Sequence, residues 1–418
     1  MSAAGRSIDR IELSALNREL TSAPDRQFAR VVAMVDALPR RGAADDLIAP
    51  FRPRLAQLRP ARPLRFCRLL FSPFDPVIVP GPKWRPGSPS IPRTVLEPFA
   101  ESVRTELGPA ADEIEAFIAG RTTDDTAIIA RAGAVLWPAA ARILARSETP
   151  PPRWAETGLP GALYGTVSRG IAVVLAQATD LHELVEKVAH GAKLRPEDVL
   201  RILDTRIVSA PEAWGMLLAS LLSRLPQADA VLRAAIANGL IGPNSVMRVA
   251  AEQAIDVVLD GLEAQGGDAG PVGGGELSQA SAEVTRILAL LQGLDSAKLS
   301  PDRRRRAQAL RQRVDESCIT RFEAGLACQF VAPLTLLQPD ADPAEVTRLE
   351  DIARDLRKLE AAARKLNPRN GLEAQLLRAA GQIGAMNENS ALELADRVRL
   401  VEILAGPDAA MAMFEAGA

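Results

Sequence analysis

Helix-start signals recur along this chain, and they constrain its fold more than any other feature. A serine or threonine is followed three positions later by aspartate at 22–25 and at 122–125, which is the pattern of a capping box. Ser300 precedes Pro301, and proline is favoured at the first position of a helix. The best strand candidate, Val77–Val79, is bracketed by prolines that leave it too short. Because the apolar residues are mainly Ala, Leu, Val and Ile, and only 4% of the chain is aromatic, we predict an all-α protein.

Residues 94–265 contain a succession of short apolar-periodic runs separated by Gly or Pro turns. Clear examples are Pro211–Arg224, Ala228–Ala237 and 246–262. Stacked helices of this length are typical of α-solenoids of the HEAT or armadillo type. No fixed period of about 33 to 47 residues recurs. We therefore predict an irregular helical-repeat-like body.

The C-terminal part has a different helical pattern. Its apolar residues are spaced alternately three and four apart, which places them in one narrow stripe that faces a partner helix. Neither stripe is long enough for a freestanding coiled coil, so we predict a C-terminal helical bundle. The stripes consist of Ala280, Val284, Ile287, Leu291 and Leu294, and of Leu349, Ile352, Leu356, Leu359, Ala363 and Leu366.

A glycine-rich segment, GGDAGPVGGGE at 266–276, marks the sharpest boundary in the chain. Such a composition is typical of a flexible linker. The predicted division is therefore N-terminal helices at 1–50, a basic proline-rich arm at 51–93, the helical-repeat-like body at 94–265, the linker, and the bundle at 277–418.

Residues 51–93, called here the Pro/Arg segment, break the helical pattern. Ten of the chain's 31 prolines lie in it, and each removes a backbone donor that a helix would need. Nine basic residues face one acid, Asp75, so the segment carries +8 while the whole chain carries −2. Five aromatic residues lie there as well. These features predict an extended arm with a basic and aromatic contact surface.

The Pro/Arg segment has several interpretations. As a structural arm, it would bury its large apolar side chains in a groove of the helical body. As a recognition arm, it would bind a protein partner, anionic lipid through residues 64–86, or nucleic acid by phosphate contacts and stacking. Our candidate partner-binding residues are the basic and aromatic side chains Arg65, Phe66, Arg68, Phe71, Phe74, Lys83, Trp84 and Arg85.

A second basic patch starts one residue into the helix predicted after Ser300. Together with residues 52–68, it would provide the surface for nucleic-acid binding, which is the alternative function. Four consecutive arginines wrap around a helix instead of forming one face, and acidic residues lie close by, so an ordinary solvated helix explains the run as well. The patch consists of Arg303, Arg304, Arg305, Arg306, Arg311 and Arg313.

The two histidines of the chain lie on one predicted helix. His182, Glu186 and His190 are spaced four apart and share a face, so they are weak candidates for a metal site. The ends of the row are about 12 Å apart by helix rise, which is too far for one ion. The alternative is a surface helix that ends at His190, with Gly191 as its cap.

Catalytic motifs are absent from the sequence. No GxxxxGK[ST] phosphate loop, no GxGxxG after a strand and no GxSxG elbow occurs. The three cysteines, Cys67, Cys318 and Cys328, are too few and too far apart for a disulfide framework or a zinc cluster. We therefore predict a protein without enzymatic activity or cofactor.

The predicted location is the cytoplasm. The first twenty residues are polar and lack the apolar block of a signal peptide. The apolar stretch around 128–144 is interrupted by Arg131, Pro138 and Arg142, so we do not expect a transmembrane segment. We predict a cytoplasmic scaffold or adaptor that binds a protein partner through a helical surface and the Pro/Arg segment.

Overall fold

The computed structural model describes residues 62–417 except 243, 266–276, 298–299, 338–342 and 387–391, together with Arg30, Val31 and Met34. Over these residues the protein is predominantly helical, with 79% helix and 2% strand, so the all-α prediction is confirmed. Apart from Arg30, Val31 and Met34, the region 1–50 with its predicted helices lies outside the described residues, as do the linker at 266–276 and the basic residues at 52–59.

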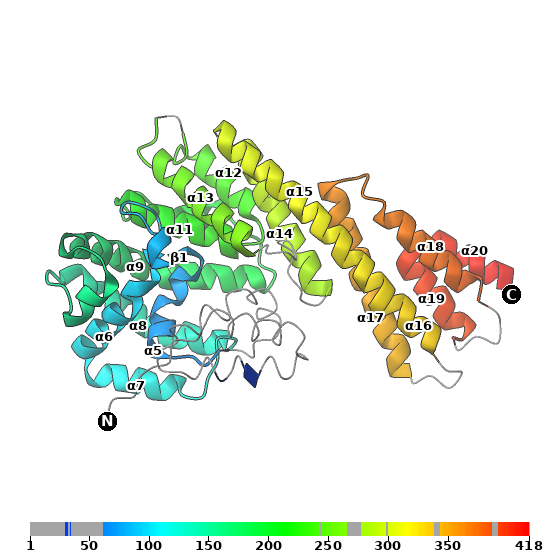
Figure 1. Ribbon diagram of the computed structural model, residues 1–418, viewed down its shortest axis with the longest axis horizontal. Helices are drawn as coiled ribbons and strands as arrows, with labels where there is room; N and C mark the ends of the chain where they lie inside the picture. The colour runs from blue at the N-terminus through cyan, green and yellow to red at the C-terminus, as the bar shows by residue number, and fades with distance from the viewer. Residues whose placement is uncertain are drawn as a thin grey trace, which may run out of the picture.

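The first group of helices forms the larger mass in Figure 1. The ranges predicted for two of its helices, α11 and α12, are confirmed. The group consists of α5 (Phe66–Phe71), α6 (Leu96–Leu107), α7 (Pro109–Ile118), α8 (Thr126–Arg146), α9 (Tyr164–Ala189), α10 (Pro196–Ile202), α11 (Pro211–Arg224), α12 (Ala228–Ala237) and α13 (Arg248–Gln265).

The second group extends away from this mass to the C-terminus (Figure 1). Its longest members, α15 and α17, pack against each other, and α18, α19 and α20 form the far end. The group consists of α14 (Leu277–Ser296), α15 (Pro301–Ala324), the π-helix η7 (Gly325–Val331), α16 (Ala332–Leu336), α17 (Pro343–Leu366), α18 (Leu372–Gly384), α19 (Leu394–Ala405) and α20 (Pro407–Gly417).

Two of the predicted helix starts can be compared with the structure. α15 begins at Pro301, and the Ser300 hydroxyl accepts a hydrogen bond from the Arg303 backbone N–H at 3.4 Å, as a helix cap does. At the second start the helix begins later than the capping box predicts. Thr122 lies before α8, and its backbone N–H donates to the Asp125 carboxylate at 2.7 Å, while α8 starts at Thr126.

The predicted apolar stripes of the C-terminal part face other helices. All five residues of the first stripe, from Ala280 to Leu294, are buried, and α14 packs against α17, which carries the second stripe. α14 also packs against α12 of the first group, so the helices on the two sides of 266–276 are in direct contact. The division of the chain into domains and the HEAT or armadillo repeat type stay predictions.

The described part of the Pro/Arg segment is not an extended arm. Residues 64–71 contain no proline, and Phe66–Phe71 form helix α5. Pro73 and Pro76 lie in the 3-10 turn η2 (Ser72–Val77), and Pro82 lies in the 3-10 turn η3 (Gly81–Lys83). The strand candidate forms a two-residue strand, β1 (Ile78–Val79). It pairs in parallel with β2 (Ile91–Pro92) in the register Ile78 to Ile91. The turns and the short ladder fold the segment back on itself.

This segment lies at the centre of the first group of helices. α5 packs against α6, α7 and α8, and η2 packs against α9, α11 and α13. The Leu69 carbonyl accepts a hydrogen bond from Trp137 Nε1 of α8 at 3.0 Å. From α11, the Ser220 hydroxyl donates to the Pro73 carbonyl at 3.4 Å and Arg224 donates to the Ser72 carbonyl. Residues 66–77 therefore connect helices that are far apart in the sequence.

Remaining short elements complete the first group. The 3-10 turn η4 (Arg93–Val95) leads into α6, and η5 (Pro152–Thr157) and η6 (Gly161–Leu163) lie between α8 and α9. Trp154 of η5 and Tyr164 at the start of α9 are buried against Phe99 of α6, with ring centroids 5.1 to 5.7 Å apart. This aromatic cluster holds the connection between α8 and α9 against α6.

Candidate functional site

The aromatic residues predicted to bind a partner are part of the protein core. Phe66, Phe71, Phe74 and Trp84 are 6%, 2%, 0% and 8% exposed. They therefore offer no surface to a partner in this structure. The sequence could not decide this point, because a large apolar side chain in a proline-rich segment is equally well buried by its own chain or by another molecule.

Trp84 illustrates how the segment is held. Its backbone has polyproline-like angles, φ −72° and ψ 146°, as its proline-rich surroundings predict. Its indole Nε1 donates to the Ser90 carbonyl at 2.9 Å and closes the loop 84–90. At the far end of this loop Pro89 packs against Gly215 of α11, where a Cβ atom would lie 2.7 Å from the Pro89 Cβ. The loop fits only because this helix position has no side chain.

The basic residues of the same segment lie differently. Arg65, Lys83 and Arg85 are exposed, and Arg68 is half-buried and donates to the Pro63 carbonyl. Arg85 donates to the carbonyls of Pro82 and Trp84, each at 2.9 Å, so it stabilises its own loop. Of the eight predicted partner-binding residues, the structure leaves three basic ones exposed and buries the four aromatic ones.

The second basic patch is paired with acidic residues of α13. Arg303 bonds to Glu252 at 2.7 Å and to Asp256 at 2.7 and 3.0 Å. Arg306 lies one turn further along and contacts Asp256 and Glu263 at 3.4 and 3.0 Å, and also Asp260. These ion pairs pull the pKa of both guanidinium groups upwards, against the burial that lowers it. The two arginines therefore serve to join α15 to α13.

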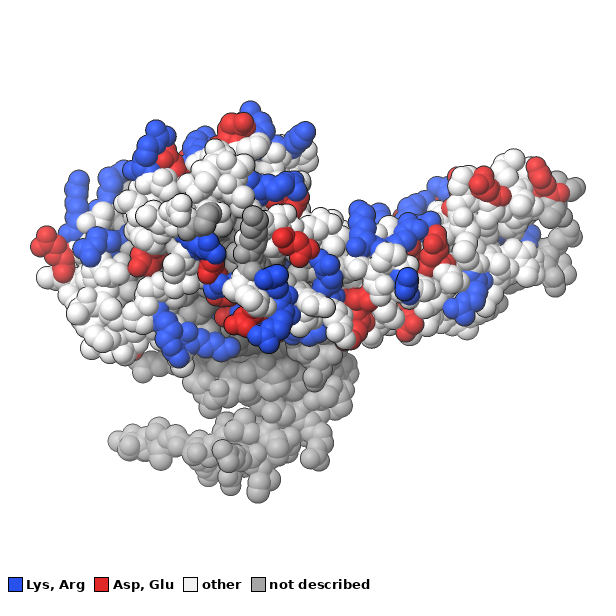
Figure 2. Space-filling model, turned by 90° about the horizontal axis from the view of Figure 1, so that it is seen from above, with Lys and Arg blue, Asp and Glu red and all other residues white. Residues whose placement is uncertain are grey.

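The remaining arginines of this patch are closer to the solvent. Arg305 pairs with Asp302, Arg311 with Asp295 at 3.0 Å and Arg313 with Glu263 at 3.9 Å, while Arg304 is exposed. On the face shown in Figure 2, acidic side chains are interspersed with the basic ones over both groups of helices. Most of the predicted nucleic-acid contacts thus have carboxylate partners within the protein.

The histidine row does not form a metal site in the described part of the chain. His182 is half-buried with its ring against Trp137, the centroids being 5.6 Å apart. Burial lowers its pKa, and Glu186 opposes this shift. His190 is exposed, and its Nδ1 lies 2.8 Å from the Glu186 carbonyl at the end of α9, where Gly191 has φ +87°. No group of three or more His, Cys, Asp or Glu side chains among the described residues could hold a metal ion.

The cysteines do not provide an activated nucleophile within these helices. All three are free; Cys318 is buried, Cys67 is half-buried and Cys328 is exposed. Burial raises the pKa of the Cys318 thiol to about 12, and burial with Glu97 nearby raises that of Cys67. Both thiols are therefore protonated at neutral pH, whereas thiolate is the nucleophilic form.

A surface that the sequence did not single out runs along α8. Arg131, Val135, Ala139, Arg142 and Arg146 are spaced four, four, three and four apart, so they share one side of the helix, called here the α8 face. Val135 is 63% exposed, and the three arginines are exposed as well. The helix contains no acidic residue, so this face combines apolar and basic side chains only. The signal in the sequence is an apolar helix with arginines at helical spacing, a pattern that by itself argues only against a membrane span.

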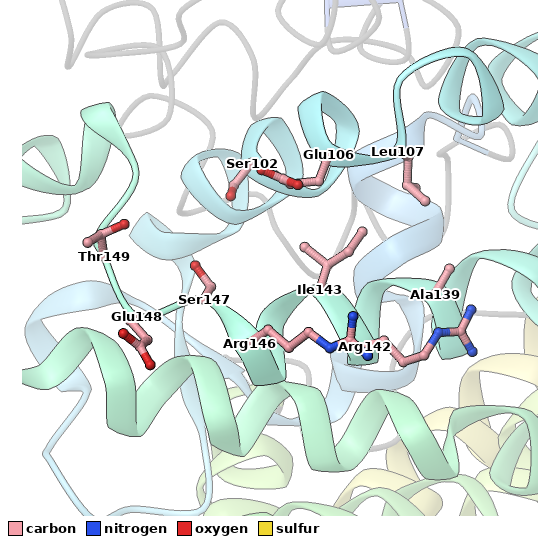
Figure 3. Close-up of a pocket in the computed structure, with 10 residues that line it drawn as sticks. All are labelled: Ser102, Glu106, Leu107, Ala139, Arg142, Ile143, Arg146, Ser147, Glu148 and Thr149. Carbon is pink, nitrogen blue, oxygen red and sulfur yellow. The ribbon is translucent and has the colours of Figure 1, made fainter.

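A pocket of about 600 Å³ lies at the C-terminal half of the α8 face. Figure 3 shows Ser102 and Glu106 of α6 across from Ile143, Arg142 and Arg146 of α8. Ser147 and Glu148, which follow α8, line its end. No ion pair joins Arg142 or Arg146 to a carboxylate in the described chain, although Glu106 and Glu148 line the same pocket.

The N-terminal half of the α8 face is bordered by α7. The Arg131 guanidinium lies over the Phe117 ring, 5.2 Å from its centroid, and Phe117 is 39% exposed. Such a cation–π contact fixes the position of the guanidinium over the ring and leaves the other side of the guanidinium in solvent. The α8 face therefore carries Val135 and Ala139 in its middle, with Arg131 before them and Arg142 and Arg146 after them.

The composition of α8 also meets the length and hydropathy criteria for a membrane span, which no other helix in the described residues does. This is weak evidence, because the core helices of many proteins meet the same criteria. Leu136, Trp137 and Leu144 are buried on its inner side, and α8 packs closely against α9. Even so, only 44% of the residues in its most apolar stretch are buried, and Val135 is the large apolar side chain of α8 that is mostly exposed.

Comparison with models of protein families, with curated protein sequences and with solved structures finds no match to this chain.

Proposed function

We propose that this protein is a non-enzymatic scaffold or adaptor that binds a protein partner through the α8 face and the adjoining pocket. The single observation that carries the proposal is that the apolar helix α8 exposes Val135, at 63%, on a face that it shares with three exposed arginines. Burial of such surface is the main driving force of protein association. An irregular helical-repeat-like body of the HEAT or armadillo kind would present such a helix on a rigid support.

The Pro/Arg segment has a supporting role in this proposal. Its buried aromatic side chains fix α5 and η2 between the helices of the body, and α5 packs directly against α8. Because α8 is held from its inner side, the α8 face is presented without a change of conformation. Pre-organised surfaces lose less conformational entropy when they bind.

Nucleic-acid binding is less well supported than protein binding. Arg303 and Arg306 would have to leave their carboxylate partners on α13 to contact phosphates. Breaking these ion pairs opposes the gain from counterion release that favours binding to nucleic acids. No observation on the described residues favours a lipid surface over a protein at residues 64–86, because the large apolar side chains there are buried.

The test uses full-length protein purified from its own cells with the substitution Val135→Asp. We expect this charge on the α8 face to remove a stoichiometric protein partner while the melting temperature stays close to that of the wild type. Ile207→Asp is the matched control, because Ile207 is 59% exposed and lies outside the α8 face. A partner that is kept by Val135→Asp, or lost equally in both variants, would contradict the proposed surface.

A further inference from the structure

The charge on the α8 face restricts the kind of partner that fits it. Three arginines and no acidic residue lie on α8, in a chain whose net charge is −2. Many other arginines of the described chain form ion pairs, among them Arg303 and Arg306. Arg142 and Arg146 form none there, although each is exposed and lies one turn from the other. Arg142 and Arg146 therefore give the α8 face positive charge that no residue of α8 neutralises.

The dimensions of the α8 face match those of another helix. Arg131 and Arg146 are fifteen positions apart, which corresponds to about 22 Å of helix, or about four turns. The apolar groups between them, Val135 and Ala139, lie in the middle of this length, and the arginines lie near its ends. Helix-in-groove recognition uses this kind of arrangement, in which apolar anchors recur at helical spacing and charges flank them.

We propose that the α8 face binds an acidic amphipathic helix of a partner protein. This inference rests on the proposed function and adds the chemistry of the partner to it. The apolar stripe of the partner helix packs on Val135 and on the exposed edge of the Phe117 ring. Its carboxylates lie beside Arg131, Arg142 and Arg146, where they form ion pairs that the described residues of the chain do not supply.

The two acidic side chains of the pocket determine how the partner helix lies. Glu106 comes from α6, across the pocket from α8, and Glu148 lies beyond the end of α8. Like charges repel, so the carboxylates of the partner follow the arginines on α8 and stay away from the α6 wall. A lysine of the partner fits beside Glu106. The site therefore selects an acidic helix by position and does not attract anions in general.

Two synthetic peptides and one vesicle preparation test the inference on the full-length protein. The first peptide is an amphipathic helix of about 18 residues with a leucine stripe and glutamates elsewhere. The second peptide has lysine in place of every glutamate, and the vesicles contain phosphatidylglycerol. We expect the glutamate peptide to bind at least about tenfold more tightly than the lysine peptide, with an affinity that falls as salt is added.

Substitutions identify the groups responsible. The double substitution Arg142→Glu and Arg146→Glu should lower the affinity for the glutamate peptide at least about tenfold. Replacement of both arginines by lysine should keep most of this affinity. The double substitution Arg304→Glu and Arg305→Glu makes the same change of charge on α15 and serves as the control. Val135→Asp should also lower the affinity for the glutamate peptide, because it removes the apolar side chain on which the peptide packs.

Each other outcome overturns the inference. Equal binding of the two peptides, or equal loss in the control variant, means that the α8 face does not select acidic helices. Binding of vesicles but of neither peptide, abolished by the Arg142 and Arg146 substitutions, assigns the face to an anionic membrane. If Val135→Asp removes the cellular partner while charge reversal at Arg142 and Arg146 leaves it bound, the scaffold function stands and the acidic partner is wrong.

Discussion

Residues 62–95 and residues 300–313 are both rich in arginine, yet the structure uses them in different ways. In the first region the aromatic side chains enter the core, and Arg65, Lys83 and Arg85 remain exposed around them. In the second region Arg303 and Arg306 turn towards another helix and pair with a row of carboxylates on α13. The first region stabilises the fold through apolar burial and the second through ion pairs.

The difference shows why an excess of arginine is a poor guide to a binding surface. In both regions an anionic partner is one interpretation that the sequence allows, and in both the structure supplies internal contacts, for the aromatic side chains of the first and for Arg303 and Arg306 of the second. The α8 face has fewer arginines than either region, but its charges remain without carboxylate partners in the described chain.

The largest effect is expected for Trp84→Ala. Trp84 is 8% exposed and closes the loop 84–90, so its removal should lower the free energy of unfolding by about 3–5 kcal/mol. Urea unfolding followed by circular dichroism measures the change. Lys83→Ala, on the exposed neighbour, should stay within about 0.5 kcal/mol of the wild type. If Trp84→Ala left the stability unchanged and abolished binding of the partner, residues 62–95 would be a recognition arm. The proposed difference between the two regions would then be wrong.

The close approach of Pro89 to α11 gives the second prediction. The added methyl group of Gly215→Ala would lie 2.7 Å from the Pro89 Cβ and 3.1 Å from the Ala250 carbonyl, so we expect a loss of about 1–3 kcal/mol. Gly261→Ala on α13 is the control. A Cβ there meets no atom within 4 Å. Because alanine is more stable than glycine in a helix interior, this substitution should raise the free energy of unfolding by about 0.5–1 kcal/mol. Changes of equal sign in the two variants would show that loop 84–90 does not press on α11.

The ion pairs of the second region give the third prediction. The Arg303 side chain is 17% exposed and bonds to both Glu252 and Asp256. Arg303→Ala should therefore lower the free energy of unfolding by about 1–2 kcal/mol at low salt. The loss should shrink as salt is added, because screening weakens the pairs already in the wild type. Arg305→Ala should change little, since that side chain is 78% exposed. If the loss of stability in Arg303→Ala did not depend on salt, it would come from the packing of the aliphatic part of the arginine and not from its charge.

The smallest effect concerns His182 and pH. Burial lowers the pKa of His182 below its usual value of 6.5, so the folded protein binds fewer protons at this site than the unfolded chain does. Its contribution is therefore constant above pH 6.5 and becomes destabilising as the pH falls below that value. Replacement by glutamine should flatten the decline in stability between pH 7 and 5, measured as a difference from wild type. His190→Gln, at an exposed helix end, is the control, and an identical effect in both variants would contradict this account.

The helices of this protein could be predicted well from the sequence. The ranges Pro211–Arg224 and Ala228–Ala237, the helix start at Pro301 and the buried stripe from Ala280 to Leu294 all follow from local signals. Caps and apolar periodicity act over three to four residues, so a linear reading captures them. The exception was the Pro/Arg segment, which was predicted as an extended arm although its proline-free residues 64–71 can form amphipathic helical turns, as α5 does.

The candidate site could be predicted much less well. The aromatic residues chosen for partner binding are core residues, and the α8 face was noted only for its effect on a membrane span. Exposure of a side chain depends on what packs beside it. α8 is covered on its inner side by α5 and α9, and no property of its own sequence states which side remains uncovered.

The sequence by itself determined the all-α class, the ranges of α11 and α12, the start of α15 and the buried stripe of α14, because these depend on neighbours within one or two turns. Only the tertiary structure decided the roles of the charged and aromatic side chains. Arg303 meets Asp256 across 47 positions, Trp137 meets Leu69 across 68, and Arg224 meets Ser72 across 152. Such pairs form when distant segments pack, and the free energy of that packing belongs to the whole core and cannot be assigned to any one segment.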